Sequence, residues 1–187
     1  MNSRQLHIGG TTVKQGWEIL NAIDNEGVDH VGNAMDLSRF ESDTFDRIYG
    51  SHVLEHFDYF KAGAKSIAEG CQGSELMIAL KEWHRVLKQG GELCISVPDL
   101  AVLSKMLLES TNSDKALDFS IMRIIYGGHI DAYDFHKVGF TEPILVDYLE
   151  VAGFSSFWRT QQFNYFEDTS KMEINGTPIS LNIVAIK

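Results

Sequence analysis

Histidine and acidic side chains gather in a short segment near the middle of the chain. Ser51, His52, Glu55 and His56 fall within six residues. Glu55 is four residues after Ser51, so the two side chains share a face if the segment is helical. Histidine titrates near pH 6.5, so His52 or His56 is suited to act as a general base at neutral pH. The alternative is a helix-capping serine followed by a solvated glutamate and histidine.

A second polar and aromatic segment spans residues 126–140. It holds His129 and His136, either of which is a candidate general base. Tyr133 and Lys137 lie between and beside them and are candidate substrate contacts. For each of these side chains a surface or packing role is the alternative.

The sequence predicts no metal site. His129, Asp131 and His136 offer ligand atoms, but their spacing matches no zinc pattern. The chain has two cysteines, Cys71 and Cys94, too few for a disulfide framework or a cysteine cluster. This cysteine content is typical of a reducing compartment.

Short apolar runs alternate with amphipathic stretches, which favours an α/β fold. We expect a Rossmann-like, mostly parallel sheet flanked by helices, with an antiparallel pair at the C-terminal edge. Residues 1–187 form a single domain in this interpretation, with a substrate-side insertion at about 117–140. Strands are expected at residues 6–8, 17–23, 29–34, 45–50, 92–97, 154–160 and 181–186, and helices at 75–87, 101–108, 117–125 and 141–152.

Three segments are harder to assign. Residues 17–23 read as a strand, although Val13, Trp17 and Leu20 would also share a helical face. Residues 60–74 are rich in Ala, Gly, Lys and Ser and predict a loop or a weak helix. Gly90 and Gly91 are expected to end the preceding helix in a left-handed cap.

Composition limits the partners. The 187 residues carry a net charge of -10, and 44% of them are hydrophobic. An acidic protein is repelled by nucleic acid and by anionic membranes, and no apolar run is long enough to span a bilayer. We expect a cytoplasmic protein that binds a small molecule, with no nucleic acid or membrane partner. The sequence predicts no particular oligomeric state.

Two motifs carry a resemblance to a known family. Residues 51–57 read S-H-V-L-E-H-F, and residues 80–99 read L-K-E-W-H-R-V-L-K-Q-G-G-E-L-C-I-S-V-P-D. Together they resemble the class I S-adenosylmethionine-dependent methyltransferases, and within them the small bacterial type 11 group. Gln89 stands where that group usually has proline. On these motifs the resemblance covers about two-thirds of the chain.

The resemblance implies cofactor contacts at the carboxyl ends of the strands. Gly9 and Gly10 correspond to the family's longer glycine-rich turn, and the helix that normally follows that turn is shortened or absent. Asp24 corresponds to the acid that binds the ribose hydroxyls, and it also fits a turn. The segment from Gly32 to Leu37, which includes Asn33, corresponds to the adenine-binding block, where Asp36 is placed to bind the adenine amino group and is alternatively a turn or cap residue.

The remaining implied contacts and the activity follow from the same resemblance. Ser51 and His52 line the methionine end of the cofactor in the family. The implied reaction is methyl transfer from S-adenosylmethionine to a small-molecule acceptor. The shortened glycine turn keeps open a methyltransferase-fold binding or regulatory module without catalysis. A nicotinamide-dependent oxidoreductase is disfavoured because G-x-G-x-x-G is missing.

Overall fold

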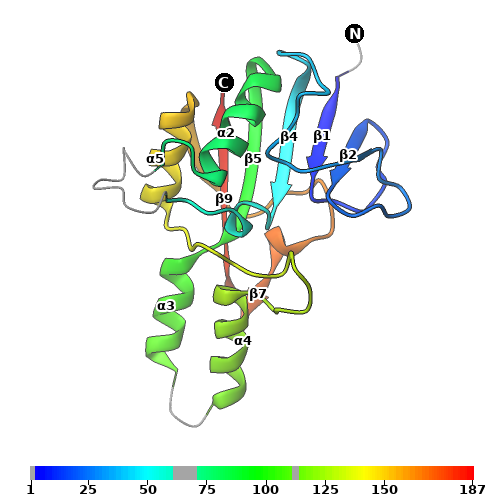
Figure 1. Ribbon diagram of the computed structural model, residues 1–187. Coiled ribbons are helices and arrows are strands. Elements are labelled where there is room, and N and C mark those ends of the chain that lie inside the picture. Colours follow the sequence, from blue (N-terminus) through cyan, green and yellow to red (C-terminus); the bar gives the residue numbers. More distant parts are fainter. Residues whose placement is uncertain (1–2, 61–70, 111–113) are drawn as a thin grey trace.

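A seven-stranded sheet forms the centre of the computed structural model, which describes residues 3–60, 71–110 and 114–187 (Figure 1). The strand order is β3-β2-β1-β4-β5-β9-β6, and the first five of these strands are parallel. β9 runs antiparallel to both β5 and β6. This arrangement confirms the predicted fold class and the antiparallel pair at the C-terminal edge. The strands are β1 Gln5–Ile8, β2 Trp17–Asn21, β3 His30–Val31, β4 Phe45–Ser51, β5 Leu87–Pro98, β6 Ser155–Thr160 and β9 Ser180–Ile186.

The helices occupy two places relative to the sheet. α2 (Glu75–Val86) and α5 (Glu142–Ala152) pack on one face of it. α3 (Leu100–Glu109) and α4 (Lys115–Tyr126) extend beyond the sheet as a pair with an apolar cluster of their own (Figure 1). The short elements are the 3-10 helices η1 Leu54–His56 and η2 Thr169–Lys171, and a separate hairpin of β7 Glu173–Ile174 and β8 Thr177–Pro178.

The helix α2 forms where its sequence predicts it. Ser74 caps its first turn, accepting a hydrogen bond from the Met77 backbone N–H at 3.2 Å. Its buried side includes Leu80 and Trp83, which are spaced for one helical face. The expected glycine cap is wrong, however, because the helix ends at Val86 and an extended residue follows it. β5 therefore starts before the glycine pair and contains it.

The other expected boundaries hold to different degrees. Residues 17–21 are a strand, so the helical alternative for that stretch is wrong. The expected strand at 29–34 shrinks to two residues, since the chain turns away at residue 32. Thr141 precedes α5 as predicted but its side chain makes no cap hydrogen bond, whereas Gly153 ends that helix in the left-handed conformation. Most of the ambiguous 60–74 stretch lies outside the described residues.

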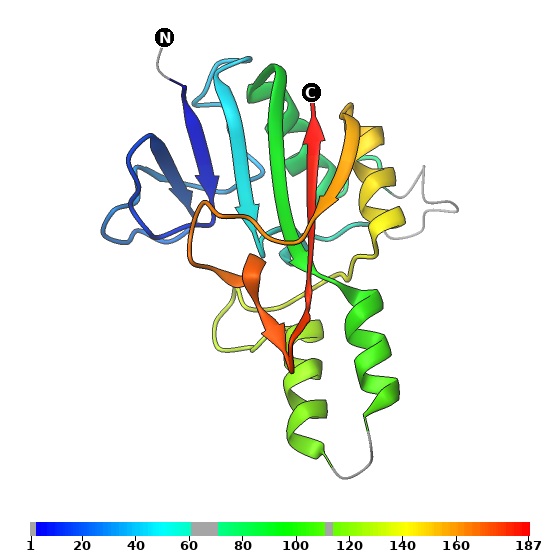
Figure 2. The ribbon, with the colours of Figure 1, turned by 180° about the vertical axis from the view of Figure 1, so that it is seen from behind.

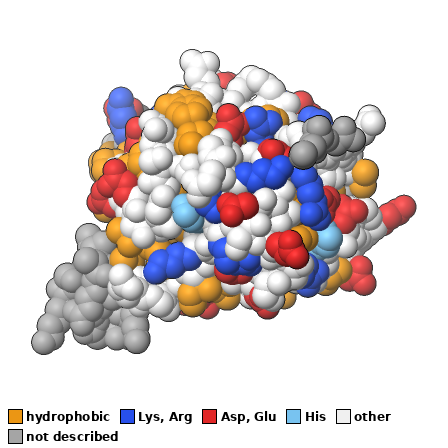
Figure 3. Space-filling model, turned by 90° about the horizontal axis from the view of Figure 1, so that it is seen from above, with side chains coloured by type: hydrophobic (Ala, Val, Ile, Leu, Met, Phe, Trp, Pro, Cys, Tyr) orange, Lys and Arg blue, Asp and Glu red, His pale blue; other side chains and the backbone are white. Residues whose placement is uncertain are grey.

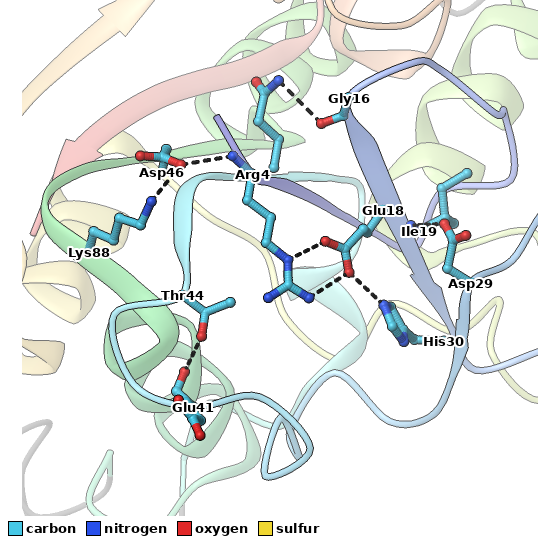
Figure 4. Close-up of polar contacts among 11 residues, drawn as sticks. Arg4, Gly16, Glu18, Ile19, Asp29, His30, Glu41, Thr44, Asp46 and Lys88 are labelled. Carbon is cyan, nitrogen blue, oxygen red and sulfur yellow. Dashed lines mark hydrogen bonds and ion pairs between the residues drawn. The ribbon is translucent and has the colours of Figure 1, made fainter. Parts of the chain in front are cut away.

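Polar contacts hold the strands together in the half of the sheet without crossover helices. Residues 9–44, all of them described, contain no helix, so β1, β2, β3 and β4 are joined by coil. Arg4 pairs with Glu18, and Glu18 lies 2.8 Å from His30 on the neighbouring strand (Figure 4). Asp46 accepts hydrogen bonds from the Arg4 backbone N–H and from Lys88, each at 2.8 Å (Figure 4). Ion pairs and hydrogen bonds therefore help to stabilise the strand packing here, whereas packed helices stabilise it elsewhere in the fold.

The sheet face remote from α2 and α5 is covered by coil. The connection between β6 and η2 crosses this face (Figure 2). Its Phe163 and Phe166 form a buried cluster with Tyr49 and Cys94 of the sheet. Phe166 stacks on the His7 ring at a centroid distance of 4.0 Å. The segment 161–168, called the aromatic cover below, therefore fills the space on this side of the sheet.

Charges of both signs are mixed at the amino end of the parallel strands. Figure 3 views this end and shows Lys and Arg side chains interspersed with Asp and Glu. Lys187 pairs with Asp43 at 2.9 Å, and Arg47 pairs with Glu92. In this view basic and acidic side chains therefore lie next to one another at the amino end of the sheet.

Candidate functional site

A cavity of about 490 Å³ lies at the opposite end, beyond the carboxyl ends of β1, β2 and β4. Open parallel sheets bind ligands at this edge, where the strand order reverses. Here the reversal falls between β1 and β4. The lining residues are Ile8, Gly9, Leu20, Asn21, Ala22, Ile23, Gly32, Asn33, Ala34, Met35, His52, Val53, His56, Phe57, Glu75, Ala132, Tyr133, Phe135 and Lys137.

Gly9 forms the wall above β1. Its φ is +80°, and a Cβ there would come within 2.6 Å of Val53 Cγ2. Only glycine therefore fits between the turn and η1. Gly10 lies outside the lining, and its missing side chain makes room for the buried His7 ring. Of the two predicted glycines, Gly9 therefore lines the cavity, and Gly10 leaves room for His7 to pack against the aromatic cover.

Asn21 occupies the end of β2, nearer the cavity than the expected Asp24. Its Nδ2 donates to the carbonyl oxygens of Gly9 and Gly10 at 3.1 and 2.9 Å, and its Oδ1 accepts from the Ile23 backbone N–H. Asp24 is exposed and lies outside the lining. The strand ends at Asn21, two residues earlier than expected, so Asp24 lies in the loop that follows it.

The segment that the resemblance assigns to adenine binding lies only partly at the cavity. Asn33 and Met35 line the cavity, and the Asn33 Oδ1 accepts the Met35 backbone N–H at 2.9 Å. Asp36 is exposed, and its Oδ1 accepts the Ser38 backbone N–H at 3.0 Å. Asp36 therefore has the turn geometry that was its alternative interpretation.

His52 lies in the floor beside η1, with a φ of +54°. Its Nε2 is 3.1 Å from the Ser180 hydroxyl, and its Nδ1 is 3.3 Å from a Glu55 oxygen. Burial lowers the pKa of His52 to about 4, so the ring is neutral at pH 7. Ser51, its neighbour, is outside the lining and faces the Thr169 hydroxyl at 3.2 Å.

Glu55 is buried rather than solvated, which the sequence did not reveal. Its side chain is 1% exposed, and burial raises its pKa to about 8. His136 Nε2 lies 4.0 Å from the Glu55 carboxylate, and burial lowers the pKa of His136. His56 borders the cavity, and its ring is 4.9 Å from that of His136. The predicted site residues His52, His56 and His136 thus lie around the buried Glu55 side chain.

The segment 127–140 closes the outer side of the cavity. Tyr133 and Lys137 line it, as does Phe135. Lys137 donates to Glu75 at 2.7 Å, and this hydrogen bond raises the Lys137 pKa. His129 lies outside the lining, where it stacks on Phe135 at 4.1 Å.

A match to a known family agrees with this geometry. A family model described as a methyltransferase domain matches residues 20–95, and the strand order and the cavity at the switch point fit that assignment. The matched segment therefore resembles a methyltransferase domain, and the chain as a whole has the fold of S-adenosylmethionine-dependent methyltransferases. The match runs from β2 to β5 and includes most of the cavity wall.

Solved methyltransferases share the fold at low identity. A SAM-dependent methyltransferase from Thermotoga maritima has a TM-score of 0.54 and 20% identity, over 98% of this chain and 82% of that one. One from Archaeoglobus fulgidus has a TM-score of 0.58 and 16% identity, over 99% and 86% of the two chains. No curated protein sequence matches the chain.

The structure brings together six of the predicted site residues around the cavity, and His136 lies just behind them. Gly10, Asp24, Asp36, Ser51 and His129 are outside the lining. Sequence reasoning missed Asn21 as a cavity residue. An asparagine at a strand end next to a glycine turn is a signal that could have identified it, because its amide can bond to the turn carbonyls. The six residues on the cavity wall are Gly9, Asn33, His52, His56, Tyr133 and Lys137.

Proposed function

We propose that this chain transfers a methyl group from S-adenosylmethionine to a small-molecule acceptor. The position of the cavity carries the proposal, since it lies at the switch point of the sheet and within the matched methyltransferase domain. Its volume of about 490 Å³ falls in the range of small-molecule sites, about 300–1,000 Å³.

The residues of the inner wall fit the cofactor. Gly9 presents bare backbone to a ligand, because nothing projects from its Cα. Asn21 and Asn33 supply polar groups for a ribose and an adenine edge, while Ile23 and Met35 supply apolar surface for a ring. When bound, the cofactor supplies the activated methyl group. In this proposal Asn21 takes the role that the sequence assigned to Asp24.

The outer wall fits the acceptor. Tyr133, Phe135 and Lys137 come from the segment that the sequence identified as the substrate-side insertion. These residues would orient the acceptor toward the methyl group that bound S-adenosylmethionine would supply. The protein's task is to align the two reactants and exclude water.

A base is required only where the acceptor holds a proton at pH 7. Among the predicted bases, His56 faces the cavity, and its Nδ1 is 3.1 Å from the Phe135 carbonyl oxygen. That contact holds the imidazole with its Nε2 available as an acceptor. We assign the base role to His56 and a supporting role to His136, which is behind it.

A small acceptor agrees with charge and size. The net charge of -10 disfavours nucleic acid, and no described helix has the length and apolar character to cross a membrane. A cytoplasmic location, expected from the sequence, is part of the same proposal.

Titration calorimetry with S-adenosylmethionine and S-adenosylhomocysteine tests the proposal. We expect binding at micromolar concentration, and about tenfold weaker binding for Asn21→Ala because the turn of Gly9 loses its amide support. Asp24→Ala is the matched control, three residues along the same loop, and should leave affinity unchanged. Equal loss in both variants, or none in either, would show that the ribose contact is elsewhere.

The competing function is a binding module without catalysis. The feature that favours it is the coil of residues 9–16 in place of a helix after β1. Failure to bind either cofactor form rejects the enzyme. A thermal shift with NADH in place of S-adenosylhomocysteine would indicate an oxidoreductase instead.

A further inference from the structure

Three potential metal ligands meet beside the cavity, which one of them, His56, borders. Glu55 and His56 come from η1, and His136 comes from the segment 127–140, eighty residues later. Each offers one ligand atom, and the three atoms lie within 4.8 Å of one another. The convergence is fixed by the backbone, because the N–H groups of Lys137 and Val138 donate to the Glu55 carbonyl oxygen at 2.8 and 3.3 Å.

The Glu55 carboxylate is an independent sign that a ligand is missing. It is fully buried, and within the described parts of the chain neither oxygen accepts a hydrogen bond. His52 Nδ1 lies 3.3 Å from one Glu55 oxygen, and its other ring nitrogen faces Ser180. Burial of a carboxyl group without a hydrogen-bond partner costs free energy. A bound cation would satisfy both oxygens at once.

We infer that Glu55, His56 and His136 bind a divalent transition-metal ion. Two imidazoles and a carboxylate form a donor set that suits Zn²⁺, Mn²⁺, Fe²⁺ or Co²⁺. The contact of His56 Nδ1 with the Phe135 carbonyl oxygen leaves Nε2 with a free lone pair. Metal bonds of about 2.1 Å hold donors roughly 3–4 Å apart, so binding draws these side chains inward by about 1 Å.

The place of this cluster suggests what the ion does. His52 and His56 border the cavity beside Phe135 and Tyr133, on the side that the proposed function gives to the acceptor. This step rests on the proposed function. On that basis we assign the acceptor to the hydroxyl compounds, with the hydroxyl oxygen bound to the ion. Coordination makes the hydroxyl more acidic, as it does for water on Zn²⁺. With its Nε2 on the ion, His56 no longer acts as the base: the O–H proton leaves to solvent, the oxygen forms the bond to the methyl carbon, and the carbon–sulfur electrons stay on sulfur.

Metal binding is measured on the full chain without cofactor or acceptor. Protein treated with EDTA and dialysed is titrated with Co²⁺, Zn²⁺ and Mn²⁺, followed by calorimetry and by the visible absorption of Co²⁺. We expect one equivalent with a Kd of about 10 µM or tighter. Glu55→Gln and His136→Ala should each weaken binding by about tenfold or more. His30→Ala, which changes a histidine on the edge strand β3 that pairs with Glu18, should bind as the wild type does.

Folding of the variants is checked by thermal unfolding without metal. Glu55→Gln keeps the shape of the side chain and removes a buried acid, so it should unfold at or above the wild-type temperature. Addition of Zn²⁺ should raise the wild-type transition by more than that of Glu55→Gln at the same concentration. No binding of the three ions, or equal binding by wild type, Glu55→Gln and His136→Ala, would overturn the inference.

The test also separates this inference from the proposed function. If the protein binds metal but neither cofactor form, the metal site is supported and the proposed methyltransferase function is rejected. Binding of S-adenosylhomocysteine with no binding of metal has the opposite meaning, and His56 then acts as a metal-free base.

Discussion

The two faces of the sheet are built differently. On one face Ile48, Leu93 and Ile183 pack against α2 and α5 in a continuous apolar core. On the other, Tyr49 and Cys94 meet the aromatic cover, a coil segment. Parallel sheets usually bury both faces under helices and use apolar residues throughout. Here β5 alternates instead, with Glu92, Cys94 and Ser96 toward the coil, so its sequence resembles that of a one-sided sheet.

The cavity depends on the loops at the carboxyl ends of the strands and not on the coil-covered face of the sheet. The cavity is lined from the loops after β1, β2 and β4, from η1 and from the segment 127–140. The aromatic cover contributes nothing to that lining. A helix on the second face is therefore dispensable for shaping the site, provided that other side chains keep water off the strands. Mutations on the two faces can test this separation.

The largest effect is expected on the helical face. Trp83 is fully buried, and its Nε1 donates to the Ala34 carbonyl oxygen at 2.8 Å. Trp83→Ala should lower the unfolding free energy by about 4 kcal/mol, measured by urea denaturation. Because Ala34 borders the cavity, cofactor binding should weaken as well. Wild-type affinity in this variant would show that the helical face and the site are uncoupled.

A smaller loss is expected on the coil face. Phe166 is 6% exposed and stacks on His7. Phe166→Ala should cost about 3 kcal/mol of unfolding free energy. The same urea experiment is combined with calorimetry of S-adenosylhomocysteine binding, which should not change below the unfolding transition. A large drop in affinity would mean that the aromatic cover supports the site after all.

Acid should weaken the coil face. Burial lowers the pKa of His7 to about 4, below its unfolded value near 6.5, with Asp168 opposing the shift. The unfolded state therefore binds more protons between these values, so stability contributed by neutral His7 falls as pH drops from 6.5 toward 4. The loss is about 2 kcal/mol at pH 5. His7→Phe should reduce the difference in unfolding free energy between pH 7 and pH 5, and an unchanged difference would contradict this origin.

The smallest effect concerns the attachment of the aromatic cover. The Tyr49 hydroxyl donates to Asp168 at 2.7 Å, joining β4 to the end of the cover. Tyr49→Phe removes this hydrogen bond and keeps the ring, so a loss of about 1–2 kcal/mol is expected. Hydrogen exchange should show faster opening of residues 161–168 alone. Faster opening of α2 in the same variant would argue that the two faces unfold together.

The sequence predicts the helical face well and the coil face poorly. The apolar spacing around Leu80 and Trp83 has the helical period, and the run from Glu92 to Val97 is bounded by Gly91 and Pro98. The aromatic cover has no period, so nothing in residues 161–168 indicates where it packs. Its partners are contributed by strands far away in the sequence.

The candidate site divides along similar lines. Gly9 and His56 follow predicted strands closely, so their place at the cavity could be inferred from topology. Strand ends are the least certain boundaries in a sequence. Because β2 ends at Asn21, Asn21 faces the cavity, whereas Asp24, three residues later, faces solvent. The burial of Glu55 depends on the docking of residues 136–138, a long-range contact that local pattern does not record.

The pair of α3 and α4 has one more consequence. Leu103 and Ile121 bury each other with Ile179 in a cluster separate from the main core, and α4 leads directly into the loop that carries Tyr133. Exchanging this helical hairpin and its trailing loop for those of a relative would leave the strands intact. Under the proposed function, selectivity for the acceptor would therefore be transferred together with this helical pair and loop as one unit.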